Sequence, residues 1–223
     1  MSSRRRWEKK GDDDDLRGDE RRYEIVEATW HLIGTIGLEK TTMRRIADQV
    51  NCTTGLVTHY FASKDDVLLS AIQQMMDKSR ARMQEATKGL QGIVRLRKLV
   101  LAALPLDDER LLEWRVWLAF WGRAYPAPRL RREQQLRFSQ WRKAIRGALD
   151  DAVALGEVPR SLSVDIETKR LVATIVGLSV ETIVSGGRID SDAIVAVVDR
   201  QLAGLIPGDR SRPHASSRAV LGA

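Results

Sequence analysis

The sequence predicts an all-α fold, and three observations support this prediction. Glycine and proline are sparse between residues 40 and 205, which favours helices over strands. Apolar residues recur at spacings of three and four along most of the chain, as on one face of a helix. No useful stretch alternates apolar and polar residues as a half-buried strand does. The 223 residues, 43% of them hydrophobic, suffice for a small head joined to a larger body.

The first 19 residues are predicted to be a disordered leader. They set the basic cluster Arg4–Arg6 against the aspartates Asp12–Asp15, with too few large apolar residues to fold alone. The alternative is a basic arm in the minor groove of DNA, but the aspartates would repel phosphates. Over residues 21–36 we expect an amphipathic helix that Gly37 ends in a left-handed conformation. Its apolar stripe is Ile25, Ala28, Leu32 and Ile36, flanked by Trp30 and Ile33.

Residues 42–64 have the pattern of a helix-turn-helix. The first short helix has an apolar face of Met43, Ile46, Ala47 and Val50. Thr41 or Thr42 caps this helix and Thr53 or Thr54 caps the next, with Asn51 and Cys52 in the turn between them. The second helix is anchored by Leu56, Val57, Tyr60 and Phe61. Its other side carries Thr53, Thr54, Gly55, Thr58 and His59.

That other side is unusual because it is small, polar and almost uncharged. A helix face that only meets solvent carries Lys and Glu. Thr, Gly and His can instead approach a duplex closely and hydrogen-bond to base edges and phosphates. This pattern therefore favours a DNA-recognition helix. A structural polar contact is the alternative role for His59.

The stretch GLVTHYFASKDDVL, residues 55–68, resembles the DNA-binding domain of TetR-type transcriptional regulators. The matching residues are Gly37, Thr42, Ile46, Ala47, Gly55, Tyr60, Phe61, Lys64 and Leu68. The resemblance implies that the side with Thr53, Thr54, Gly55, Thr58 and His59 faces the major groove. It also implies phosphate contacts from Tyr60 and Lys64, with help from Thr42 and Arg44. Most family members have an aromatic residue at the position of Thr58, so no base preference is carried over.

Further helices are expected to follow in order. Ser63 and Asp66 form a capping box that starts a long helix to about Ala86. The next helices are expected over 93–104, 107–124 and 130–155, with Pro126 and Pro128 ending the second of them. Two more begin near residues 163 and 190 and end near Gly186 and Leu205. We therefore expect a DNA-binding domain over 20–66, a helical ligand-binding and dimerisation domain over 67–206, and a flexible tail over 207–223.

The helix over 107–124 carries the candidate ligand site. Trp114, Trp117 and Trp121 fall on one side of it, and Tyr125 and Trp141 are candidates to join them. Clustered indoles near Glu113 suit a cationic or quaternary-ammonium ligand through cation–π attraction. The alternative is that these tryptophans are bulky core.

Two short segments of the body carry a second resemblance. EWRVW and LAFW, within about residues 90–205, resemble the body of the choline-responsive BetI-type branch of the family. Val176 stands before Gly177-Leu178 where BetI-like proteins tend to have Asp. The resemblance therefore does not assign the ligand.

The last two helices are predicted to form a dimer interface. They are apolar over much of their circumference and rich in small residues, namely Ala173, Gly177, Ser179, Ala193, Ala196 and Ala203. Helices of this kind must bury a second face. Two copies of the pair can form a four-helix bundle, and family members dimerise there. Burial within one subunit is the alternative.

Composition and charge limit the remaining classes of protein. The net charge of +7 favours polyanions such as nucleic acid. Cys52 is the only cysteine, which excludes an internal disulfide and fits a cytoplasmic protein. No apolar run reaches the roughly 20 residues of a membrane span, and no secretory signal is present. The sequence lacks a phosphate loop, a nucleophile elbow, HExxH and a Cys/His cluster, so we expect no enzyme, cofactor or metal site.

Together these observations predict a cytoplasmic, ligand-responsive transcriptional regulator. We expect a repressor that binds a palindromic operator as a homodimer and that a small-molecule effector releases. The competing interpretation is a helical small-molecule-binding protein without a DNA function. A gel shift with the chain's own upstream DNA separates the two.

Overall fold

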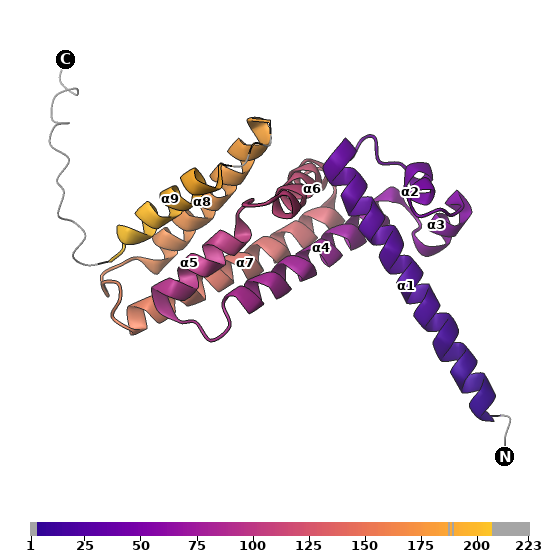
Figure 1. Cartoon of the computed structure of the whole chain (residues 1–223), viewed down its shortest axis with the longest axis horizontal. Coiled ribbons are helices and arrows are strands. Elements are labelled where there is room, and N and C mark those ends of the chain that lie inside the picture. The colour runs from indigo at the N-terminus through magenta and orange to yellow at the C-terminus, as the bar shows by residue number, and fades with distance from the viewer. Residues whose placement is uncertain (1–3, 187, 189, 207–223) are drawn as a thin grey trace. The chain divides into compact units, whose positions relative to one another are not determined.

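The computed structural model describes residues 4–186, 188 and 190–206, and within them the fold is helical (Figure 1). The helices are α1 (Arg4–Ile36), α2 (Met43–Gln49), α3 (Thr54–Tyr60), α4 (Lys64–Ala86), α5 (Gly92–Ala103), α6 (Asp108–Ala124), α7 (Pro128–Ala154), α8 (Val164–Val184) and α9 (Ser191–Ala203). No strand occurs among the described residues, and the all-α prediction is confirmed. None of these helices has both the length and the apolar character needed to cross a bilayer.

The chain divides into two compact units. The first comprises Met1–Ala81 and Asp107–Phe138, and the second comprises Arg82–Leu106 and Ser139–Ala223. The first unit therefore groups α6 and the start of α7 with the helix-turn-helix, whereas we had expected a division by role at residue 66. The division by role remains a prediction, and the predicted flexible tail over 207–223 lies outside the described residues.

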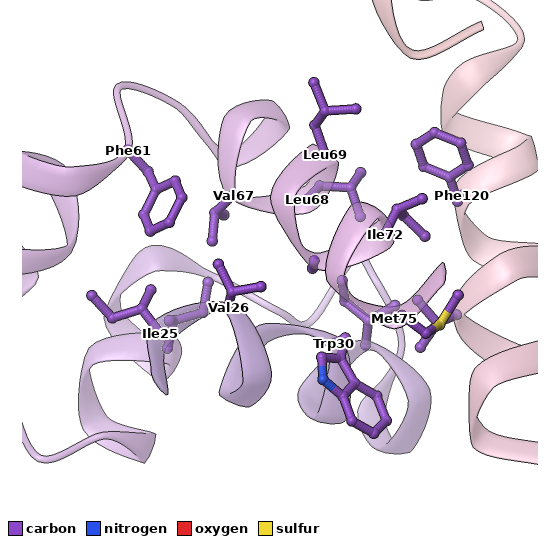
Figure 2. Close-up of a cluster of buried hydrophobic side chains, with 14 of the residues drawn as sticks. Ile25, Val26, Trp30, Phe61, Val67, Leu68, Leu69, Ile72, Met75 and Phe120 are labelled. Carbon is purple, nitrogen blue, oxygen red and sulfur yellow. The ribbon is translucent and has the colours of Figure 1, made fainter. Parts of the chain in front are cut away.

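One continuous hydrophobic core holds the first unit together (Figure 2). Its buried side chains come from all the helices of the unit and include Ile25, Val26, Trp30, Ile46, Val57, Phe61, Leu68, Ile72, Met75, Phe120 and Leu130. Complete burial of one such side chain contributes about 1.5–3 kcal/mol. The short helices α2 and α3 would be unstable alone, so this core keeps them folded.

The buried face of α1 is shifted from the predicted stripe but shares Ile25, Trp30 and Ile33 with the prediction. Ile25, Thr29 and Ile33 are buried together with Val26 and Trp30, whereas Ala28, Leu32 and Ile36 are only half-buried. Thr29 lies on this face, and its hydroxyl donates a hydrogen bond to the Ile25 carbonyl at 2.7 Å. Because that bond satisfies the hydroxyl, a threonine can lie on the buried side.

Helix α1 is also longer than predicted and crosses α6 at close range. It begins at Arg4, so the structure differs from the predicted disordered leader over residues 4–19. The segment contains no proline, and lengthening an existing helix costs little per residue. Near the other end, a Cβ built on Gly34 would lie 2.4 Å from Leu112 Cδ1 of α6. Gly37 ends the helix with φ +86, as predicted.

Polar contacts in the second unit join α5 to its neighbours. Arg97 of α5 makes two bonds to Asp199 of α9, at 2.6 and 2.9 Å. Arg95 bonds to Asp151 of α7 at 2.5 Å. A carboxylate oxygen of Glu157 accepts the Ile93 backbone N–H at 2.6 Å, which satisfies one free amide of the first turn of α5.

Candidate functional site

The outer face of α3 is exposed over the residues that we expected to read DNA. Thr53, Thr54, Gly55, Thr58 and His59 are all exposed. The underside is formed by Val57, which is 0% exposed, and by Phe61, which is 2% exposed. The uncharged face therefore lies at the surface of a well-anchored helix.

The hydroxyl groups on this face are partly used within the helix. Thr53 Oγ1 accepts the Leu56 N–H at 3.2 Å and so caps α3, as predicted. Thr58 Oγ1 donates to the Gly55 carbonyl at 3.0 Å. The Thr58 oxygen keeps its lone pairs for a donor on a base, such as the amino group of adenine or cytosine.

Two consecutive arginines of α1 hold the ends of α2 and α3, and sequence reasoning did not single them out. Arg21 donates to the Val50 carbonyl at 3.0 Å, directly after α2. Arg22 donates to the Tyr60 carbonyl at 3.4 Å and lies 4.6 Å from the centre of the Phe61 ring. Cations are favoured at helix C-termini, where the last carbonyls lack partners. The available clue was a basic pair just before the buried part of α1.

The predicted phosphate-binding residues lie in three different settings. Thr42 is exposed and caps α2 by accepting the Arg45 N–H at 3.2 Å. Arg44 is exposed on the first turn of α2. Tyr60 is half-buried, with its ring edge-on to His59 at 5.3 Å.

The ammonium group of Lys64 uses one of its donors in a hydrogen bond within the protein. Its Nζ donates to the Leu38 carbonyl at 2.7 Å, in the segment between α1 and α2. An ammonium group has three donors, so this bond leaves capacity for a phosphate. The phosphate contact of Lys64 stays a prediction.

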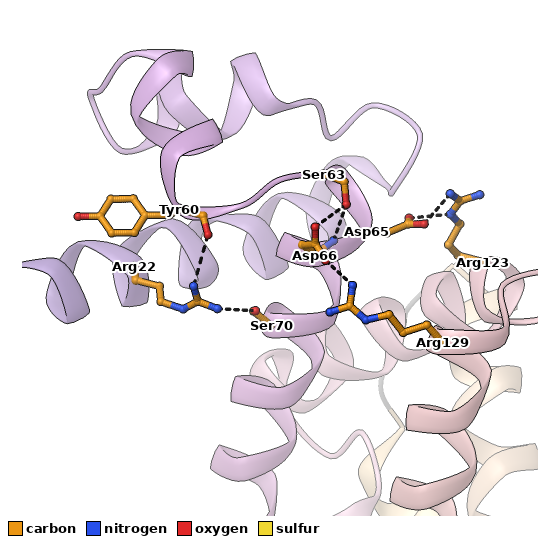
Figure 3. A network of polar contacts seen from close by, with 8 residues as sticks. All are labelled: Arg22, Tyr60, Ser63, Asp65, Asp66, Ser70, Arg123 and Arg129. Atoms are coloured by element: carbon orange, nitrogen blue, oxygen red, sulfur yellow. Dashed lines mark hydrogen bonds and ion pairs between the residues drawn. The ribbon is translucent and has the colours of Figure 1, made fainter.

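A polar network surrounds the start of α4 (Figure 3). Ser63 Oγ accepts the Asp66 N–H at 3.1 Å and donates to the Asp66 carboxylate at 2.8 Å, which confirms the predicted cap. The Asp65 carboxylate takes two bonds from Arg123 of α6, both at 2.9 Å. Asp66 also pairs with Arg129 of α7. The bonds from Ser63 and Arg129 lower the pKa of Asp66.

Three of the predicted ligand-binding residues form an aromatic cluster on α6. The Trp121 ring lies 6.3 Å from the Trp114 ring and 6.2 Å from the Trp117 ring. It also meets Phe138 of α7 edge-on at 6.3 Å. The indole nitrogen of Trp121 is buried and has no hydrogen-bond partner among the described residues. A buried donor of this kind is uncommon and suits a ligand atom that accepts a hydrogen bond.

The other three predicted ligand-binding residues lie in different settings. Tyr125 ends α6 and is 80% exposed, so it does not line an enclosed space. Trp141 belongs to the second compact unit. Glu113 is buried at 6% exposure on the same helix as the cluster. The sequence made Tyr125 a candidate to join the indoles, and it lies directly after the last residue of α6.

A hollow of about 430 Å³ in the first unit was not predicted. It is lined by Glu24, Glu27, Ala28, Trp30, His31 and Gln49. Beside it, Lys78 of α4 bonds to Glu27 at 2.6 Å and lies over the rings of Tyr23 and Trp30 at 5.7 and 5.4 Å. This contact ties α4 to α1 within the unit.

The last two helices carry exposed small and apolar side chains. On α8 these are Ile166, Ala173, Gly177 and Val184, and on α9 they are Ala193, Ala196 and Val197. Ser179 differs from the prediction, because it is fully buried and donates to the Ile175 carbonyl at 2.7 Å. Most of the predicted interface residues thus remain available on the surface of one subunit.

The described part of the chain holds no group of three or more His, Cys, Asp or Glu that could bind a metal ion. Cys52 is half-buried in the turn of the helix-turn-helix, 3.5 Å from the Thr53 carbonyl. His31 and His59 are exposed on different helices. His214 lies outside the described residues.

Two families match the sequence, and together they cover most of the chain. The family described as bacterial regulatory proteins of the tetR family matches residues 25–71. The family described as BetI-type transcriptional repressor, C-terminal, matches residues 93–207.

Known proteins with similar sequences are transcriptional regulators. The regulator PksA of Bacillus subtilis is 28% identical over 185 residues, which are 81% of this chain and 87% of that protein. The regulator BetI of Burkholderia mallei is 30% identical over 118 residues, 52% of this chain and 60% of the BetI chain. The chain thus spans less than two thirds of the BetI relative.

Solved structures share the fold. A transcriptional regulator of Rhodococcus sp. Rha1 has a TM-score of 0.72 at 25% identity and covers 82% of this chain and 95% of that one. A regulator of Saccharomonospora viridis, solved in complex with choline, has a TM-score of 0.79 at 24% identity, covering 84% and 98%.

Proposed function

Because this chain belongs to the TetR family of transcriptional regulators and has a BetI-type C-terminal part, we propose that it is a repressor that binds a palindromic operator as a homodimer in the cytoplasm. A small-molecule effector releases it from DNA. The observation that carries the proposal is the exposed, uncharged face of α3 above a completely buried Val57. Two such faces must lie roughly 34–36 Å apart to reach successive major grooves.

The residues of α3 and its surroundings have separate roles in this proposal. Thr53, Thr54, Gly55, Thr58 and His59 meet the base edges, and Thr42, Arg44, Tyr60 and Lys64 hold phosphates. Base contacts provide discrimination of about 1–3 kcal/mol each. Phosphate contacts provide affinity that falls with salt, with a slope of about 0.9 for each neutralised phosphate.

A binding titration with the chain's own upstream DNA tests this assignment. Arg44→Gln should weaken binding to all duplexes and reduce the salt slope by about one. Thr58→Ala should change base preference and leave the slope as it is. Lys88→Gln is the matched control, because Lys88 is an exposed cation in the loop between α4 and α5. Equal binding of the wild type to operator and random duplex at moderate salt would overturn the proposal.

The effector is proposed to be a small organic cation that stacks on Trp117 and Trp121. Support comes from the aromatic cluster on α6, since indole faces attract quaternary ammonium groups by about 0.5–2 kcal/mol. Choline, present in the S. viridis structure, is a suitable probe for calorimetry. Its uncharged carbon isostere, 3,3-dimethylbutan-1-ol, is the matched control and should bind about 2- to 30-fold more weakly. Equal binding of both would show that charge is not recognised.

Dimerisation is proposed to use the exposed faces of α8 and α9. Val184 is an apolar residue that is 77% exposed. Exposure of such side chains to water is unfavourable, and an interface that buries them removes this unfavourable exposure. Gly177 and Ala173 allow a second helix to approach closely. Light scattering should give twice the chain mass of 25.1 kDa. A monomer at micromolar concentration would overturn this part of the proposal.

A further inference from the structure

The first turn of α4 is held from two sides by arginines of other helices. Asp65 takes both of its bonds from Arg123, on the last turn of α6. Asp66 pairs with Arg129, the second residue of α7. The end of α6 and the start of α7 therefore both contact the first turn of α4 (Figure 3).

These two ion pairs lie directly after the recognition helix α3 in the chain. Helix α3 ends at Tyr60 and α4 begins at Lys64, so only three residues separate them. The two ends of that segment are fixed by Phe61, which is buried, and by the Ser63 cap. A shift of the first turn of α4 must therefore shift the end of α3 as well.

Two carboxylates at this place are unexpected in a protein that binds phosphates. Negative charges stabilise the N-terminus of a helix, but near DNA they repel the backbone. Arg123 compensates the charge of Asp65 through a two-bond contact, the strongest geometry available to such a pair. The arginines thus let α4 keep its acidic first turn beside the recognition helix.

We infer that Arg123 and Arg129 are positioning residues for DNA binding, because they hold the first turn of α4 and neutralise its carboxylates. The inference rests on the proposed DNA-binding function. It deepens that function because it names two residues outside the helix-turn-helix that set the position of α3.

A charge reversal in the full-length chain tests the inference. Operator affinity is measured by fluorescence anisotropy for Arg123→Asp, Asp65→Arg and the double variant. Arg123→Asp should weaken binding at least tenfold, and the double variant should return to within about threefold of the wild type with the wild-type salt slope. If Arg123 instead touched a phosphate directly, the double variant would stay weak and the slope would fall by about 0.9. If Asp65→Arg alone bound more tightly than the wild type, Asp65 would only be repelling DNA.

A control uses an interhelical Arg–Asp ion pair in the second unit, one that has a single bond. Arg95 and Asp151 join α5 to α7 at 2.5 Å. Their reversal, singly and together, should change operator affinity by less than twofold. A tenfold loss here would mean that any broken ion pair harms binding, and the inference would fail.

Hydrogen exchange tests the hold on α4 without DNA. Arg123→Asp should raise the exchange rates of the backbone amides over residues 63–68, and Arg95→Asp should not. Unchanged exchange in Arg123→Asp overturns the inference even if operator binding falls. If the wild type binds no operator while Arg123→Asp still loosens this segment, the DNA-binding function fails and the hold on α4 stands.

Discussion

Replacement of Gly34 by alanine should weaken the first unit, because α1 and α6 cross there at a distance that only glycine allows. An added Cβ would lie 2.4 Å from Leu112 Cδ1, 2.7 Å from Cγ and 3.2 Å from the Leu112 carbonyl oxygen. Carbon atoms pack best at about 3.5–4.0 Å. The side chain of Leu112 can rotate, but the backbone oxygen cannot, so the two helices must move apart.

Gly122 of α6 supplies the matched control. Both glycines stand two residues before the last residue of their helix, and both belong to the first unit. A Cβ on Gly122 meets nothing within 4 Å. Gly122→Ala should therefore gain up to about 1 kcal/mol from helix propensity. Gly34→Ala gains the same amount and loses about 1–3 kcal/mol by overpacking, so its net stability should fall by up to about 2 kcal/mol.

Thermal unfolding followed by circular dichroism measures both variants under the same conditions. For a chain of this size, 1 kcal/mol corresponds to about 2–4 °C in Tm. Gly122→Ala should melt above the wild type and Gly34→Ala below it. An equal rise in Tm for both variants would refute the close crossing of α1 and α6.

Further predictions concern the core, an ion pair and the dimer. Phe61→Ala, which empties a site that is 2% exposed, should lower the free energy of unfolding by about 3–5 kcal/mol in a urea titration and abolish operator binding; a loss below 1 kcal/mol would contradict its place in the core. The bond from Arg97 lowers the pKa of Asp199 below its ordinary 3.8. The pair therefore stabilises the fold above about pH 4, and this stabilisation is lost as the pH falls through the lowered pKa. The stability advantage of the wild type over Asp199→Asn, at most about 1 kcal/mol for an exposed pair, should thus be present at about pH 6 and shrink below about pH 3.8; an advantage that grows on acidification would contradict the sign. Val184→Glu places a charge on the proposed interface and should shift gel-filtration elution toward the monomer, whereas an unchanged dimer would place the interface elsewhere.

Local features of the helix-turn-helix could be predicted from the sequence because they depend on neighbouring residues. The caps at Thr42 and Thr53 follow from the preference of threonine for helix starts. The buried Val57 follows from apolar spacing. Gly37 at the end of α1 follows from its freedom to adopt positive φ.

Other features could not be predicted because their partners are far apart in the chain. The bond from Lys64 to the Leu38 carbonyl joins residues 26 positions apart, and the Arg123–Asp65 pair spans 58. Local patterns in one sequence do not indicate such pairs, because these contacts depend on how the helices pack together. Pro128 illustrates a different difficulty, since we expected it to end a helix and it is the first residue of α7. Proline is tolerated at that position, where no N–H partner is needed.

The aromatic cluster on α6 could be predicted only in part from the sequence. Helical spacing correctly joined Trp114, Trp117 and Trp121, because all three lie on one helix. It could not decide whether Trp141 belongs with them, since that depends on how separate helices pack. The orphan indole nitrogen of Trp121 also has no sequence signature.

The arginine pair of α1 bears on any attempt to move this recognition helix into another protein. Arg22 donates a hydrogen bond to the last carbonyl of α3 and places a cation above the Phe61 ring. Arg21 donates a hydrogen bond to the Val50 carbonyl, directly after α2. A graft of α3 alone would carry the Tyr60 carbonyl without its donor on Arg22. A transfer of this recognition helix must therefore include at least residues 21–64.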